Sequence, residues 1–121
     1  MGCERQDISI VKGVSKTLRL TVTDDDGARV DLTGATIYFC VKKTKADLTL
    51  EIALVSPTNI VILAQTGATL GQADIDLLPG DTSGLPVGQH VYDVWVEQSG
   101  GDRHAVVKPS SFFIEPSVTV L

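Results

Sequence analysis

The chain has 121 residues, of which 43% are hydrophobic, and its formal net charge is −5. This length fits a single domain, 1–121, with its own core, and the hydrophobic fraction excludes a disordered chain. The acidic balance argues against a nucleic-acid partner, because proteins that bind phosphate backbones concentrate Lys and Arg. No segment reaches the roughly 18 apolar residues of a membrane span, so we expect no membrane partner.

The first six residues have the composition of a flexible tail. They lack the apolar region of a secretory signal, so we expect the protein to be made and kept in a cytoplasm unless a larger assembly carries it out. Cys3 lies in this tail and Cys40 in an apolar strand pattern. Free thiols are the usual state of two cysteines in such a chain, although the sequence leaves their pairing open.

The first half of the chain shows the two-residue period of β-strands. Residues 7–12 predict a short strand, and 16–23 predict a second one with Leu18, Leu20 and Val22 on one face. A turn at 24–27 follows. In the next strand, the residues expected on one face are Ala35, Ile37, Phe39 and Val41.

The middle of the chain is less regular. Leu48, Leu50, Ile52 and Leu54 alternate as in a strand, although residues 45–54 would also tolerate a helical turn. Further on, the sequence predicts short strands at 60–63 and 72–78, separated by a loop at 65–71. Residues 79–84 predict a helical turn that crosses between the layers. The strand order between residues 45 and 71 is left open.

A hairpin closes the chain, with its turn at Gly100-Gly101. We expect Tyr92, Val94 and Val96 to face the core. The residue pairs expected across this hairpin are Val94 with Val107, Val96 with Ala105, Trp95 with Val106, and Glu97 with His104.

Eight to ten short strands with a turn about every ten residues predict an all-β fold, an immunoglobulin-like antiparallel β-sandwich with Greek-key connections. No helical segment is long enough for a βαβ unit. Tyr92, near the start of the penultimate long strand, is similar to the tyrosine corner of such domains. The Cys–Trp–Cys framework of antibody domains is missing.

No residue set predicts catalysis or a cofactor site. The acidic run at 24–27 lacks the closing glutamate of a calcium loop and is interpreted as a solvated turn, although Asp24, Asp26 and Asp31 could bind a cation weakly. His90 and His104 do not face each other in the expected register, and nothing completes a metal-ligand spacing. No serine stands in a Gly-x-Ser-x-Gly elbow. We therefore expect no catalytic, cofactor-binding or metal-binding residues.

Two segments are candidate interfaces. Trp95 and Val106 are expected on the outer face of the hairpin, where aromatic residues are typical of interfaces. The alternative is that a loop or the 48–63 region covers Trp95. The second candidate is the apolar C-terminal tail with Val118, Val120 and Leu121, which could add a strand to the sheet edge of a neighbouring subunit.

The sequence resembles a recurrent bacteriophage domain in five segments: 7–13, 18–24, 31–37, 81–94 and 113–119. They resemble the immunoglobulin-like domain of tailed-phage and prophage structural proteins, of which the baseplate upper protein N-terminal domain is one member. The resemblance is weakest over 45–71. It implies a non-enzymatic virion component of a tail, baseplate or head–tail junction, synthesised in the host cytoplasm. The chain lacks the C-terminal extension of larger baseplate proteins, so the virion substructure stays open.

The resemblance and the residue patterns agree on a subunit that acts by assembly. The implied partners are other phage structural proteins and further copies of the chain in a closed oligomer. The competing hypothesis is a carbohydrate- or surface-binding β-sandwich module, which would need an exposed aromatic platform. A third hypothesis is a bacterial cytoplasmic adaptor with a host partner.

Overall fold

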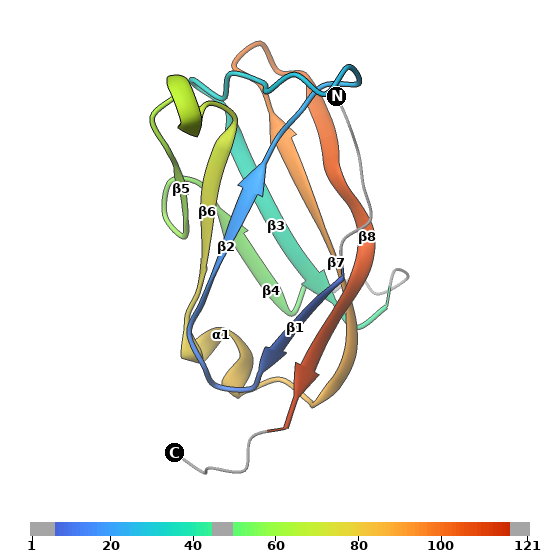
Figure 1. Cartoon of the computed structure of the whole chain (residues 1–121). Coiled ribbons are helices and arrows are strands. Elements are labelled where there is room, and N and C mark those ends of the chain that lie inside the picture. The colour runs from blue at the N-terminus through green and yellow to red at the C-terminus, as the bar shows by residue number, and fades with distance from the viewer. Residues whose placement is uncertain (1–6, 45–49, 117–121) are drawn as a thin grey trace.

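The computed structural model describes residues 7–44 and 50–116, which fold into two packed β-sheets (Figure 1). The larger sheet has the order β1 (Ile8–Val11), β8 (Arg103–Glu115), β7 (Gly88–Glu97), β3 (Thr36–Lys42) and β4 (Ile52–Val55). The smaller has the order β2 (Lys16–Thr21), β6 (Gln72–Leu77) and β5 (Ile60–Ile62). The predicted all-β sandwich is confirmed.

Alternation along each strand builds the core between the sheets. In β3, Ile37, Phe39 and Val41 are fully buried, and the intervening residues face away from the core. In β7, Tyr92, Val94 and Val96 are buried as predicted. Side chains in a strand point alternately to opposite faces, so this one pattern defines both the core and the outer face of the larger sheet.

The chain passes from one sheet to the other four times, between β1 and β2, β2 and β3, β4 and β5, and β6 and β7. The last crossing contains the helix α1 (Pro79–Ser83), which confirms the helical turn predicted there. Its Thr82 is fully buried, and the Thr82 hydroxyl accepts a hydrogen bond from the Gly13 N–H at 2.9 Å. This bond ties α1 to the β1–β2 turn.

Strand β1 departs from the predicted antiparallel arrangement. It pairs in parallel with β8, from Ile8 beside Phe112 to Val11 beside Glu115. The Asp7 carboxylate extends this contact by accepting a hydrogen bond from the Ser111 N–H at 3.0 Å. These two strands come from opposite ends of the chain, so no tight hairpin turn forces them to run in opposite directions.

The β7–β8 hairpin has a different register from the one expected. Val94 lies opposite Val107 as predicted, but Trp95 lies opposite Ala105. One extra residue, Val106, therefore stands between these pairs as a β-bulge. Val106 is buried in the core beside Val107. The prediction that placed Val106 on the outer face is wrong, because the bulge breaks the alternation on which it depended.

The bulge also corrects the remaining pairs of this hairpin. Val96 lies opposite His104 rather than Ala105, and Glu97 lies opposite Arg103 rather than His104. The turn itself is where it was predicted, because the Gly101 N–H donates to the Gln98 carbonyl at 2.8 Å with Gly101 at φ +94°. A second irregularity, between Tyr92 and Val94, places Lys108 and Pro109 opposite Asp93.

The middle of the chain forms β4, the short helix η1 (Gly67–Thr69) and the connecting turns. Ile52 and Leu54 are buried as the strand pattern predicts, whereas Leu50 is exposed and Leu48 lies outside the described residues. One side chain organises the loop after β5. The Gln65 amide oxygen accepts hydrogen bonds from the Leu32 and Gly71 N–H groups at 2.8 and 3.0 Å, and its amide nitrogen donates to the Leu63 carbonyl.

Candidate interaction surface

Trp95 lies on the outer face of the larger sheet, as the sequence predicts. It alternates with the buried Val94 and Val96, and 42% of its surface is exposed. Neither a loop nor the region around β4 and β5 covers it completely within the part of the chain that the structure describes. Leu50 lines the same hollow as Trp95 but is itself 44% exposed.

Strand register places Trp95 in a row of outward-facing residues that crosses four strands. Tyr38 lies directly opposite Trp95 on one side and opposite Val55 on the other. Ala105 lies opposite Trp95 on β8. We call these four residues, Val55, Tyr38, Trp95 and Ala105, the outer row. Directly opposed side chains on neighbouring strands contact one another, so the outer row forms a continuous apolar and aromatic band.

A shallow hollow of about 460 Å³ borders this band. Its lining combines two aromatic rings with charged groups of both signs: Tyr38, Cys40, Lys42, Leu50, Asp93, Trp95 and Arg103. Aromatic residues and Arg are enriched at interfaces, whereas Lys and Asp are depleted there, so Tyr38, Trp95 and Arg103 are the lining residues that favour an interface.

Two polar contacts hold the charged side chains of the hollow in place. The indole N–H of Trp95 donates to the Asp93 carboxylate at 3.1 Å, two residues back along the same strand. Arg103 forms an ion pair with Glu97, its partner across the hairpin. A side chain already held in one position loses less conformational freedom on binding. The Trp95 ring is therefore prepared for contact with a partner.

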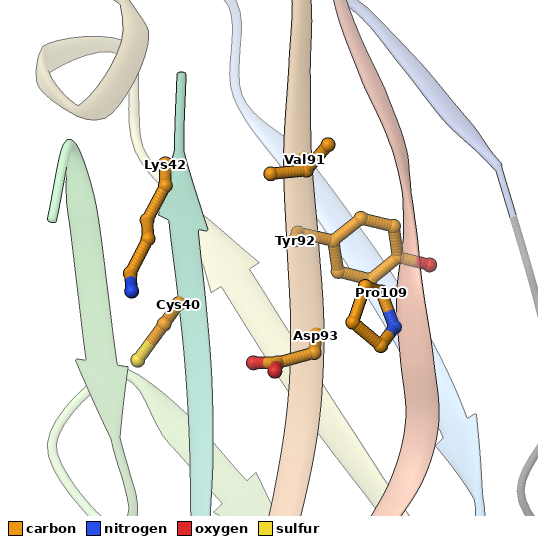
Figure 2. Close-up of a pocket in the computed structure, with 6 residues that line it drawn as sticks. All are labelled: Cys40, Lys42, Val91, Tyr92, Asp93 and Pro109. Carbon is orange, nitrogen blue, oxygen red and sulfur yellow. The ribbon is translucent and has the colours of Figure 1, made fainter. Parts of the chain in front are cut away.

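A smaller pocket of about 140 Å³ lies beside this hollow (Figure 2). Cys40 of β3 and Asp93 of β7 are register partners, and the picture shows the Asp93 carboxylate pointing toward β3 and the Lys42 amino group reaching back toward Cys40. Burial, and then the negative charge of Asp93, raise the pKa of the Cys40 thiol, while Lys42 partly opposes them. Cys40 is a free thiol. Cys3 lies outside the described residues.

The structure separates the other residues that the sequence singled out. His90 lies opposite Phe112 and is buried, whereas His104 lies opposite Val96 near the other end of the hairpin. The Asp24 carboxylate accepts hydrogen bonds from the Asp26 and Ala28 N–H groups of its own turn. Within residues 7–44 and 50–116, no three His, Cys, Asp or Glu side chains gather as metal ligands. The weak cation site considered for Asp24, Asp26 and Asp31 is therefore not assembled.

The Asp31 carboxylate serves its own turn as well. It accepts hydrogen bonds from the hydroxyl and the N–H of Thr33, at 2.6 and 2.9 Å. These two bonds hold the pKa of Asp31 below its ordinary value, with the hydroxyl making the larger contribution. The Asp31 carboxylate thus stabilises the turn that contains Thr33.

Of the predicted interface residues, the structure keeps Trp95 at the surface and moves Val106 into the core. Val118, Val120 and Leu121 lie outside the described residues. The sequence analysis missed Tyr38 as a partner of Trp95. Its alternation with Ile37 and Phe39 indicates that it faces outward, but only the pairing of β3 with β7 reveals that the two rings are neighbours.

Comparison with protein-family models and with curated proteins found no match for this chain. No helix within the described part of the chain is both long and apolar enough to cross a membrane.

Proposed function

We propose that this protein is a non-enzymatic structural component of a phage or prophage virion that works by protein–protein assembly. The outer row is the observation that carries the proposal. It presents the exposed Trp95 and Val55, with the half-buried Tyr38 between them, as one band across the sheet, and surface aromatic bands of this kind mark protein interaction sites.

The strand order supports the immunoglobulin-like part of this proposal. If β4 is taken as the additional C′ strand and the other strands are lettered A to G in chain order, the neighbours β8-β7-β3 correspond to G-F-C of immunoglobulin sandwiches, and β2-β6-β5 to B-E-D. One departure is that β1 pairs with β8 instead of β2. This arrangement agrees with the resemblance to phage immunoglobulin-like domains. We propose location in the virion after synthesis in the host cytoplasm, with other phage structural proteins and further copies of the chain as partners.

A pair of single-residue variants tests the outer row. We expect the wild-type protein to form a defined oligomer in light scattering across a concentration series, and Trp95→Ala to weaken it by at least about tenfold in dissociation constant. Phe113→Ala is the control. Phe113 is also an exposed aromatic residue of the larger sheet, but it lies opposite Gln89, about 20 Å along the strands from Trp95.

The second part of this test asks where the protein is found. Mass spectrometry of purified virions or induced prophage particles should detect the protein in a fixed ratio to the other structural proteins. Absence from the particles would overturn the virion role. A wild-type protein that is monomeric at every concentration, and that enters particles equally well as Trp95→Ala, would show that the outer row is not the assembly surface.

One observation favours a second candidate function, a carbohydrate- or surface-binding module. Tyr38 and Trp95 are register partners that line one hollow together with Asp93 and Arg103, so two rings and two charged groups lie side by side. A sugar can stack on aromatic rings and hydrogen-bond to such groups. Binding on a glycan array that Trp95→Ala abolishes and Phe113→Ala preserves would favour this function over assembly.

A further inference from the structure

Strand β2 has an open edge. It lies at the end of the smaller sheet and pairs with β6 alone among the residues described. The Val22 N–H donates to the Gly71 carbonyl at 2.8 Å, so the Val22 N–H points toward the β6 side of the ladder. Residues whose backbone groups point toward the neighbouring strand alternate along an antiparallel ladder with residues whose groups point away. The backbone N–H and C=O groups of Thr17, Arg19 and Thr21 therefore point away from β6, toward the open edge.

A hollow, which we call the slot, runs along this edge, and both polar and apolar groups line it. This hollow of about 160 Å³ touches the four consecutive residues 17–20, which a cavity facing only one side of a strand would not do. Its inner wall includes core side chains from both sheets, among them Phe39 and Val107 of the larger sheet and Ile75 of the smaller. The edge thus combines outward-pointing backbone groups with a slot that reaches apolar core side chains. These are the two elements that an added β-strand needs, since the backbone bonds give affinity and alternate side chains fill the pockets.

We propose that this slot receives the C-terminal segment 117–121 of a second copy of the chain, which adds as a strand to the edge of β2. The segment reads Ser-Val-Thr-Val-Leu, so Val118 and Val120 fall on one side of an extended strand. That side would enter the slot. The N-terminal segment 1–6, Met-Gly-Cys-Glu-Arg-Gln, has no such alternation.

Length and direction favour a second copy over the same chain. The edge groups of residues 17–21 span about 13 Å, and five extended residues reach about 17 Å. However, β8 ends at Glu115 at the end of the sandwich where β2 begins, and the two strands point in opposite directions (Figure 1). The chain's own segment would have to reverse before it could follow β2. The reversal would use up residues that the strand needs.

This contact joins two different surfaces, the C-terminal segment of one copy and the β2 edge of the next. A heterologous contact of this kind builds rings where the rotation closes and filaments where it does not. The inference rests on the proposed assembly function and names a contact separate from the outer row.

The test uses the full-length chain and two matched double variants. Val118→Asp/Val120→Asp places two charges on the side that enters the slot, and Ser117→Asp/Thr119→Asp places the same charges on the other side. We expect the first variant to weaken the oligomer by at least about tenfold and the second to change it far less, because a charge is costly to bury. Thermal unfolding checks that both variants remain folded.

Hydrogen–deuterium exchange locates the contact. In the oligomer, the Thr17, Arg19 and Thr21 amides should exchange at least about tenfold more slowly than in Val118→Asp/Val120→Asp. A synthetic peptide of residues 116–121 should restore this protection to a chain that ends at Pro116. Equal exchange of these amides in all variants would overturn the proposal. So would protection in a monomer that depends on residues 1–6.

The outcomes also separate this inference from the proposed function. An oligomer that Trp95→Ala weakens, but that neither tail variant affects, would reject strand addition and keep assembly through the outer row. A wild-type protein that is monomeric and absent from virions would reject assembly, and with it the basis of the strand-addition proposal.

Discussion

Cys40 illustrates how single neighbours set the chemistry of a residue on the outer face. The strand pattern predicts that Cys40 lies in a strand, and the structure places it in β3 as a half-buried thiol. The sequence could not predict the carboxylate beside it, because Asp93 is more than fifty residues away and meets Cys40 only through the β3–β7 register. Burial is the larger cause of the raised pKa of the Cys40 thiol, and the negative charge of the neighbouring Asp93 is the second.

We expect Asp93→Asn to speed alkylation of Cys40 at neutral pH in a Cys3→Ser background, where Cys40 is the only thiol. Removing the negative charge lowers the pKa of the thiol and so raises the fraction of reactive thiolate. The gain should stay below about tenfold, because burial remains. Mass spectrometry of iodoacetamide labelling measures the rate, and Asp76→Asn, on the other sheet, is the control. An unchanged rate in Asp93→Asn would remove Asp93 as a cause.

At the scale of elements, alternation predicts strands well, and irregularities limit the prediction. The inward residues of β3 and β7 were predicted correctly, since each strand keeps an unbroken two-residue period. The β8 register failed at Val106, because a bulge adds one residue and no sequence signal marks it. The direction of β1 failed because pairing between chain ends depends on the whole topology.

The loop between β5 and β6 depends on Gln65, which nothing in the sequence marks as structural. We expect Gln65→Ala to lower the free energy of unfolding by about 2 kcal/mol, because it removes the acceptor of the Leu32 and Gly71 N–H groups. Leu32 is fully buried, so water cannot readily replace that bond. Urea denaturation measures the free energy of unfolding of this variant and of the control Gln72→Ala. Gln72 is a suitable control because its amide makes only long hydrogen bonds at the surface. Equal stability of the two variants would contradict this role.

At the scale of the whole molecule, the sequence predicted the two-layer architecture and one exposed aromatic residue. It could not predict the surface around Trp95, because Tyr38, Val55 and Ala105 come from three other strands and share a row only after the sheet has formed. The slot beside β2 could not be predicted from the sequence either, since residues from strands of both sheets line it. Surfaces of this kind are properties of strand order, and hydropathy patterns leave strand order open.

Tyr92 links the packing of the two sheets to the pH dependence of stability. Its ring contacts Phe39 and Phe112, with centroids 5.3 and 6.1 Å apart, and the residue is only 3% exposed. Burial, followed by the negative charge of Asp7, raises the pKa of Tyr92 from 10.0 to about 12. The folded protein therefore holds the phenol proton at pH values where the unfolded chain releases it.

We expect the stability that Tyr92 contributes to be complete below pH 10 and to fall as the pH rises toward 12, the window between its unfolded and folded pKa values. A pKa difference of one unit between the folded and unfolded states corresponds to about 1.4 kcal/mol. The free energy of unfolding should therefore fall by about 2–3 kcal/mol across this window. Urea denaturation at a series of alkaline pH values measures it. In Tyr92→Phe, which keeps the ring but cannot ionise, the fall over this window should be smaller by that amount. The same slope in both proteins would show that other groups cause the alkaline loss.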